Sequence, residues 1–219
     1  KNSTDDYIYV KNILHVSLIS DISKNIKLLT NSDKYSLHKL ALLYYKRSDY
    51  KNAYDTILPI YKLNSNNLYI SIAYANILIG LDRIDEALNV LNKVKNIYPL
   101  NSVISFAIAE ILIENNLNLN YAERLLEPLK LHYNLNPNYL RISSKLYMLK
   151  NSDFKAAISR ANYYQLLDDV NMSLEVLDNT IRSNTINIEQ KRILEAKKLN
   201  IICSNPRPLE PIFGEKTCN

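Results

Sequence analysis

The sequence predicts an all-α protein in which helix–turn–helix repeats stack as a right-handed α-solenoid. Two series of small residues and the scarcity of helix breakers lead to this fold class. The first series recurs at steps of 34 and 35 residues: Ala53, Ala87 and Ala122. The second runs beside it at steps of 34, 34 and 35: Ala41, Ala75, Ala109 and Ser144. The 219 residues include only two glycines and no tryptophan, which favours helices joined by short turns.

A period near 34 with a small residue in each of two helices is typical of the tetratricopeptide (TPR) repeat. Two helices cross closely only where neither backbone is held away by a bulky side chain. Such a repeat cannot bury its apolar face alone, so it stacks on its neighbour and the array grows as one continuous unit. We therefore predict about 11–12 helices in a single solenoid.

The N-terminal segment, residues 1–33, is predicted to form two helices over 5–19 and 23–30, ahead of the repeats. Asp5 and Asp6 favour a helix start because negative charge is stabilised at a helix N-terminus. The repeats are expected over residues 34–183.

The first repeat is predicted to pair helices over 35–46 and 50–63, joined at Arg47-Ser48-Asp49. The second pairs 68–79 with 84–97, and Pro99 stops its second helix, since proline cannot continue a helix. The third pairs 102–114 with 119–133.

The register changes after the third repeat. Ala161, in the predicted helix 154–167, follows Ser144 by only 17 residues, which is half a repeat. The next segment, 167–177, aligns without gaps on 81–91. Helix 154–167 is therefore expected to serve as second helix of the fourth repeat and first helix of a fifth, giving about four to five repeats.

A C-terminal capping helix is predicted within residues 184–202, because the segment 187–202 has a charged face and an apolar stripe. Residues 203–219 hold three of the seven prolines and are expected to form an irregular tail. The tail region carries both cysteines, Cys203 and Cys218. They either close one loop in an oxidising compartment or remain two free thiols.

The net charge of +5 is consistent with an acidic partner or nucleic acid, but composition explains it better. Lys, Asn, Ile and Tyr are all abundant and have A/T-rich codons, and the basic residues are mixed with acidic ones along the chain. We expect no nucleic-acid partner. No membrane span is expected either, because the most apolar run, residues 104–113, is short and interrupted by polar side chains. The first residue is Lys1 rather than Met, so we expect a fragment or a processed product.

Motifs that would carry chemistry are missing. None of His15, His38 and His132 is followed by the Glu-x-x-His of a zinc protease, and structural or surface roles are expected for them. Gly80 and Gly214 are too far apart for a phosphate-binding loop. Nothing local indicates a nucleophile–histidine pair. We predict no catalytic residue, no metal ligand and no cofactor in this chain.

The first helices are instead expected to line a concave groove that binds a protein or peptide. Tyr and Arg are enriched at binding hot spots, and the chain has 17 tyrosines. The alternative is that about half of these tyrosines complete the inter-repeat core. A clamp for a terminal carboxylate is not expected, because the position that should hold Lys beside Asn76 is Ile72. The predicted groove residues are Tyr35, His38, Tyr45, Tyr69, Ile72, Asn76, Phe106, Glu110, Arg141 and Lys145.

Several segments point to a particular family: NSTDDY at 2–7, YKNA at 50–53 with ILPI at 57–60, and AAISRANYY at 156–164 followed by SLEVL at 173–177. With these segments the chain resembles, over residues 2–200, the C-terminal TPR region of the periplasmic β-barrel assembly-enhancing zinc metalloproteases. The tail from Cys203 has no counterpart in that family.

The resemblance implies a longer protein whose zinc-binding HExxH protease domain precedes Lys1. In that case the chain is a periplasmic, non-catalytic arm that contacts its own protease domain and the outer-membrane assembly machinery. None of the family's catalytic residues can be placed here, and zinc is expected only in the protease domain. The alternative is a free-standing TPR scaffold or co-chaperone adaptor, which would be cytoplasmic.

Overall fold

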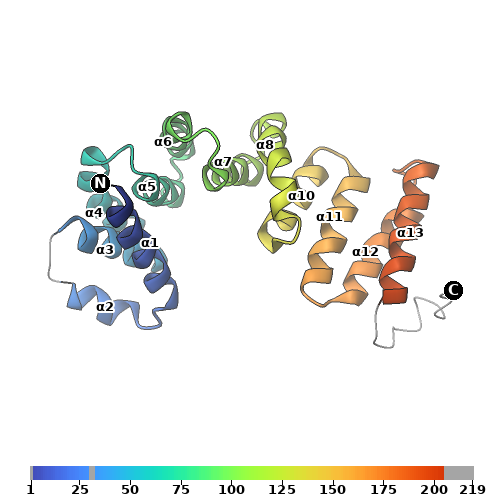
Figure 1. Cartoon of the computed structure of the whole chain (residues 1–219), viewed down its shortest axis with the longest axis horizontal. Helices are drawn as coiled ribbons and strands as arrows, with labels where there is room; N and C mark the ends of the chain where they lie inside the picture. Colours follow the sequence, from blue (N-terminus) through green and yellow to red (C-terminus); the bar gives the residue numbers. More distant parts are fainter. Residues whose placement is uncertain (1, 30–32, 205–219) are drawn as a thin grey trace. The chain divides into compact units, whose positions relative to one another are not determined.

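The computed structural model describes residues 2–29 and 33–204, and this part of the chain is built of helices and turns without strands (Figure 1). In chain order the helices are α1 (Asn2–Leu18), α2 (Ile22–Leu28), α3 (Lys34–Lys46), α4 (Tyr50–Leu63), α5 (Leu68–Gly80), α6 (Ile84–Ile97), α7 (Ser102–Glu114), α8 (Leu119–Leu126), the 3-10 helix η1 (Glu127–Leu129), α9 (Lys130–Tyr133), α10 (Pro137–Leu149), α11 (Asp153–Leu166), α12 (Val170–Arg182) and α13 (Ile188–Ser204). The predicted all-α class is confirmed. If α8, η1 and α9 are counted as one interrupted helix, the described residues contain twelve.

Two compact units divide the chain, Lys1–Ile111 and Leu112–Asn219, and the division falls within α7. In the first unit α3 packs on α4, α4 on α5, and α5 on α6. In the second unit α10 packs on α11, α11 on α12, and α12 on α13. Each unit therefore contains a run of helices, α3 to α6 in the first and α10 to α13 in the second, in which each helix contacts the next along the chain, as in a repeat stack.

The turns that follow the first helices share one backbone device. Each contains a residue in the left-handed region, with φ between 53° and 61°: Ser48, Asp82, Asn116, Asn151 and Asp168. The amide of the residue that follows bonds back to the carbonyl five positions earlier, as Asp49 N does to Tyr44 O at 2.9 Å. This is the Schellman ending, and short polar residues tolerate the left-handed conformation better than most others do.

Spacing between these turn residues reproduces the sequence period. The steps from Ser48 to Asp168 are 34, 34, 35 and 17 residues. In the third turn one extra residue, Leu117, lies between the left-handed Asn116 and the residue that caps α8, Asn118. In the other four turns the left-handed residue directly precedes the cap position. One inserted residue thus accounts for the step of 35 in both series of small residues.

Small residues recur at buried positions of the helices. Ala41 and Ala53 on α3 and α4 have no exposed surface, and Ala75 and Ala87 on α5 and α6 have none either. We call these positions, with their equivalents Ala109, Ala122, Ser144, Ala156, Ala161 and Ser173, the small-residue seam; all are buried.

Helix α11 takes part in the seam twice. The Ser144 hydroxyl of α10 donates to Ala156 O at 3.4 Å, and the Ser173 hydroxyl of α12 donates to Ala161 O at 3.0 Å. The two contacts lie about one and a half turns apart on α11. Helix α11 therefore acts as second helix to α10 and as first helix to α12.

The helix predicted over 119–133 is not continuous. It breaks at η1, where Pro128 stands at the start of the 3-10 segment. Proline has no N–H to donate and its ring collides with the carbonyl four residues earlier, so an α-helix is strained at this point. The predicted C-terminal capping helix also differs in extent: α13 continues to Ser204. The rest of the predicted tail, with Cys218, lies outside the described residues.

If close approach at the seam holds the pairs together, enlarging it should destabilise the fold. Ala75→Leu or Ala109→Leu should lower the free energy of unfolding by roughly 1–3 kcal/mol, because extra methyl groups overpack the crossing. Lys51→Leu, on the exposed side of α4, should change it by less than about 0.5 kcal/mol. Urea unfolding followed by circular dichroism measures both. Equal destabilisation by the two kinds of variant would contradict the seam.

A second close approach involves Gly80, the last residue of α5. A Cβ atom added there would overlap the ring of Tyr50, which itself lies beside Tyr45 with ring centroids 5.7 Å apart. Gly→Ala in a helix ordinarily stabilises by about 1 kcal/mol. Here Gly80→Ala should destabilise the protein. The same change in a Tyr50→Ala background should stabilise it, and a stabilising effect in both backgrounds would argue against the contact.

Candidate protein-binding surface

Helix α1 covers part of the surface that the first helices were predicted to offer a partner. It packs along α3 and also contacts α5 (Figure 1). Its Tyr9, which is almost fully buried, lies against Tyr35 and His38 of α3, with ring centroids 5.5 Å and 4.9 Å away. Two of the predicted groove residues therefore have an occupant from the same chain.

The N-terminal turns of α1 are held by polar contacts. The Asp5 carboxylate accepts from Lys34 Nζ at 2.6 Å and from the Tyr35 hydroxyl at 2.5 Å. These two bonds, that from Lys34 first, lower the pKa of Asp5. Asp6 accepts from the side-chain amide of Asn67 at 2.9 Å, and Asn67 caps α5. The start of α1 is thus tied to the starts of both α3 and α5.

Lys46, the last residue of α3, holds the other end of α1. Its ammonium group donates to the carbonyls of Val16, Ser17 and Ile19 at 2.8, 2.9 and 2.8 Å. The last carbonyls of a helix have no partner within the helix and carry partial negative charge, so a lysine both satisfies and stabilises them. Because its two ends meet the two ends of α3 in the same order, α1 runs in the same direction as α3.

His38 is completely buried beneath α1. Neither ring nitrogen has a hydrogen-bond partner among the described residues, and burial lowers its pKa from 6.5 to about 4. It is therefore a neutral core residue. The prediction that His38 lines a ligand-binding groove is wrong, because the Tyr9 ring fills that position. Tyr35 is half-buried and its hydroxyl is engaged by Asp5.

The remaining predicted residues of the first unit are at least partly accessible on α3, α5 and α7. Tyr45 is just over one-third exposed, and burial is the main reason that its pKa is raised. It therefore stays a neutral hydroxyl that can donate. We call the following set the first-helix surface: Tyr45, Tyr69, Ile72, Asn76, Phe106 and Glu110.

The two predicted basic residues of the second unit are not free cations. Arg141 Nη1 lies 3.0 Å from Glu114 Oε1, and Lys145 donates to the other oxygen of the same carboxylate. The pKa of Glu114 is lowered by Lys145 first and by Arg141 second. The three side chains together carry about one positive charge rather than two. Glu114 was missed from the sequence although it lies one helical turn after Glu110 on α7.

The position of α1 could not be read from apolar periodicity. The face of α1 that packs on the first helices carries Asp5, Tyr9, Asn12 and Val16. Their spacing puts them on one side of the helix, but polar and apolar residues alternate along it. Its apolar stripe faces solvent instead, with Tyr7, Leu14 and Leu18 exposed to 66%, 60% and 84%. The only signal in the sequence was the spacing of Tyr9 and Val16, and two residues are too few to define a face.

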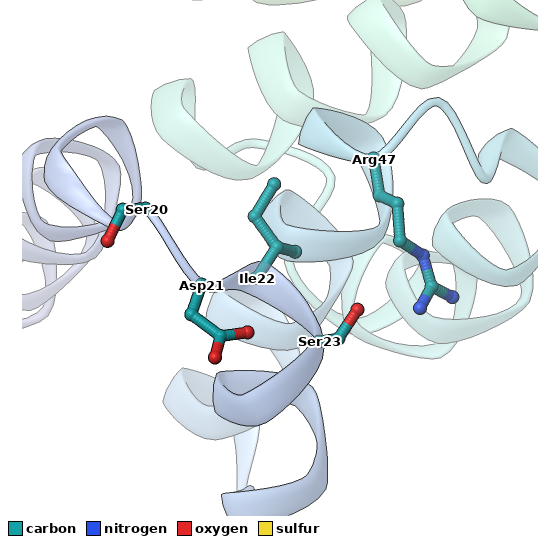
Figure 2. A pocket seen from close by; sticks show the side chains of 5 residues that line it. All are labelled: Ser20, Asp21, Ile22, Ser23 and Arg47. Atoms are coloured by element: carbon teal, nitrogen blue, oxygen red, sulfur yellow. The ribbon is translucent and has the colours of Figure 1, made fainter.

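A shallow hollow of about 510 Å³ lies at the bend between α1 and α2, lined by Ser20, Asp21, Ile22, Ser23 and Arg47 (Figure 2). Its charged groups are used locally. Asp21 caps α2 through a 3.0 Å bond from Lys24 N, and Arg47 pairs with Asp49 at 2.7 Å. Figure 2 shows that the Asp21 and Arg47 side chains do not point toward one another. The hollow therefore offers no convergent set of groups for a ligand.

Within residues 2–29 and 33–204 no three His, Cys, Asp or Glu side chains come together as a metal ion would require. No helix within them combines the length and the apolar character needed to cross a bilayer.

Comparison with known proteins bears on the repeats. Residues 24–94 match the family model described as anaphase-promoting complex, cyclosome, subunit 3, whose repeats are TPR-like. The match spans α3, α4, α5 and most of α6. Residues 24–94 are therefore a TPR-type region of this all-helical chain. Repeats of this type point to a protein–protein interaction module with a protein partner. No curated protein matches the chain, and nothing in the comparisons supports the zinc metalloprotease family.

Burial of neutral His38 should make stability depend on pH. Because its pKa is about 4 in the folded chain and near 6.5 when unfolded, acid protonates the unfolded chain first. Stability should be complete above pH 6.5 and fall by up to roughly 3 kcal/mol between pH 6.5 and 4. Urea unfolding measures the free energy of unfolding of wild type and of His38→Phe across this pH range. Because the two proteins share all other titrating groups, the difference between their curves reports on His38.

The Phe variant keeps a ring beside Tyr9 and removes the titrating group. Its stability relative to wild type should therefore rise as the pH falls. His132→Gln, at an exposed position, serves as the control and should follow wild type. Parallel curves for wild type and His38→Phe would contradict the assignment of His38 as a buried neutral residue.

Proposed function

We propose that the chain is a non-catalytic protein-interaction module that holds a partner segment on the first-helix surface. The observation that carries the proposal is the row of half-buried aromatic and apolar side chains on successive first helices, with Tyr45 on α3, Tyr69 on α5 and Phe106 on α7. Such side chains supply large contact area and lose little conformational freedom when they bind.

Regular repetition favours an elongated partner. Tyr45, Tyr69 and Phe106 are not equivalent positions, but the first helices that carry them recur once per repeat, as His38, Ile72 and Phe106 do at steps of 34 residues. A partner that touches several repeats must therefore extend across them. Polar groups on the same helices, Asn76 and Glu110, can meet its backbone or polar side chains. Helix α1 occupies the Tyr35 and His38 positions, so the partner is expected over α5, α7 and the end of α3.

The identity of the partner is proposed from the resemblance in the sequence. On that basis the chain is the recruiting arm of a periplasmic zinc metalloprotease that acts in quality control of outer-membrane protein assembly. Its partners are then the protease domain, the assembly machinery and misassembled barrel proteins. Zinc belongs to the protease domain, and the proposal assigns no cofactor to this chain.

A second candidate is a free-standing scaffold or adaptor, with a cytoplasmic location. The observation that favours it is the family match, since the matching family is named as one subunit of a multiprotein complex. The coding sequence before Lys1 separates the two candidates. An HExxH motif with a secretory signal would support the protease arm, and a sequence without either would rule it out.

Binding kinetics test the first-helix surface. The chain is immobilised, and an outer-membrane β-barrel protein diluted from urea serves as the unassembled probe. Tyr69→Ala and Phe106→Ala should each raise the dissociation rate about five- to thirtyfold, if each contributes about 1–2 kcal/mol as a hot spot. Tyr7→Ala is the matched control, because Tyr7 is an exposed tyrosine on the outer face of α1.

Charge reversal tests the cluster around Glu114 with the same probe. Arg141→Glu and Lys145→Glu should chiefly lower the association rate and its dependence on salt, because exposed charges steer encounter more than they hold a complex. Lys51→Glu on α4 is the control for net charge. The assignment is wrong, and the partner binds elsewhere, if the protein stays folded and neither the association rate nor the dissociation rate changes in any of the four test variants. These are Tyr69→Ala, Phe106→Ala, Arg141→Glu and Lys145→Glu.

A further inference from the structure

Helix α1 is only thinly attached to the helices that it covers. Among residues 4–18 only Tyr9 and Val16 are buried, whereas the shorter α5 buries seven side chains. Tyr7 and Leu18, on the far side of α1, are largely exposed. Because the burial of apolar surface is the main source of stability, an element that buries so little opens more easily than the rest of the fold.

The surface that α1 buries against α3 includes polar groups without partners. The Tyr9 hydroxyl and both ring nitrogens of His38 are shielded from water, and none of them has a hydrogen-bond partner among the described residues. The two rings meet nearly edge to face, with their centroids 4.9 Å apart. Water would hydrate these three atoms if α1 moved away, so their burial opposes the docking of α1.

The other attachments of α1 are polar bonds that water can replace. Lys34 Nζ lies 2.6 Å from an Asp5 carboxylate oxygen, and the two side chains are 40% and 35% exposed. The Asn12 side-chain amide donates to Tyr35 O at 2.8 Å, and Lys46 donates to three carbonyls at the end of α1. Because water competes with such exposed bonds, they fix the position of α1 more than they stabilise it.

Acid acts on this contact through His38. Burial alone lowers its pKa to about 4, without a contribution from any charged group on α1, α2, α4 or α5, the helices that pack against α3. Tyr9 is the titratable side chain that faces it, and because burial raises the pKa of Tyr9, this phenol stays neutral. Asp5, Asp6 and Lys34 act on the pKa of Tyr9 and not on that of His38.

Protonation of His38 favours the released helix. In contact with water the imidazole takes up a proton near pH 6.5, whereas the buried ring stays neutral down to about pH 4. Asp5, whose bonds to Lys34 and Tyr35 keep its pKa below 3.8, is still ionised in this range. Between pH 7 and 5, acid therefore weakens the docking of α1 through His38 and leaves the ion pair of Asp5 intact.

We propose that α1 is a displaceable cover that leaves α3 and α5 as one unit, more readily in acid, and thereby uncovers the face of α3 around Tyr35 and His38. Tyr45 lies on the same side of α3, seven residues after His38. Release therefore extends the first-helix surface along α3. The use of the uncovered face by a partner rests on the proposed function, whereas the release of α1 does not depend on it.

Native-state hydrogen exchange on the full chain tests the release without a partner. The amides of residues 9–16 should share one opening constant, at least about tenfold larger than that of the amides of α5, with a weaker dependence on urea. The proposal is overturned if α1 and α5 have the same constant, because α1 then opens only in global unfolding. It is also overturned if the constants fall steadily from the ends of α1 to its middle, because that gradient indicates fraying.

Two tyrosines of α1 provide a matched pair of variants for the same measurement. Tyr9→Ala should raise the opening constant of α1 at least about tenfold, because it removes the main side chain that α1 buries. Tyr7→Ala, at an exposed position of the same helix, should change the constant by less than about twofold. Equal effects of the two substitutions would contradict the role given to the Tyr9 contact.

The response to acid is measured in the same way. From pH 7 to 5 the opening constant of α1, corrected for the pH dependence of exchange itself, should rise roughly twentyfold in wild type, as the two pKa values of His38 require. His38→Phe should abolish the rise, and His15→Gln, at an exposed histidine of α1, should keep it. A constant that acid leaves unchanged in wild type, or a rise that persists in His38→Phe, would overturn the acid response.

The unassembled β-barrel probe then tests whether the uncovered face is used. The immobilised Tyr9→Ala chain should bind the probe at least about threefold more tightly than wild type, because a larger fraction of it is open, and Tyr7→Ala should match wild type. If exchange shows the release but Tyr9→Ala binds the probe no better, α1 does not cover the partner site and that part of the proposal is wrong. If no chain binds the probe, the proposed function fails, whereas the exchange result still decides the release.

Discussion

Close approach of paired helices at the small-residue seam is the constraint on which the rest of the structure depends. The Ser173 hydroxyl reaches Ala161 O on the facing helix at 3.0 Å, which is possible only where no large side chain separates the backbones. The left-handed turn residues then set where each second helix starts relative to the first. Together the seam and the turns decide which faces of the first helices remain available to a partner.

Helix α1 covers part of the surface of the first helices, so a segment of the same chain blocks access to it. Its attachment relies on polar contacts at its two ends, Asp5 with Lys34 and Tyr35 and Lys46 with the last carbonyls, and on the packing of Tyr9 between them. Such ion pairs are partly exposed and individually contribute little stability. They fix direction and register, while burial of Tyr9 and His38 supplies the apolar contact.

Two prolines show why the continuity of a helix could not always be predicted from the local sequence. Pro59 and Pro128 lie 69 residues apart, at the same point of the first and third repeats. Helix α4 continues through Pro59, whereas the chain turns into η1 at Pro128, and nothing in the described contacts explains the difference. Glu127 of η1 and Lys130 of α9 line a hollow of about 280 Å³ together with Ser143 and Tyr147 of α10.

The sequence alone determined the period, the seam, the turns and the helix pairs, because these features recur and each copy strengthens the same pattern. It also placed the partly accessible side chains Tyr45, Tyr69 and Phe106 on the first helices. Only the tertiary structure decided that α1 lies over His38, that Glu114 neutralises Arg141 and Lys145 in part, and that Ser143 faces a cavity. Each of these is a single contact between side chains brought together by folding, and a contact that occurs once leaves no period in the sequence.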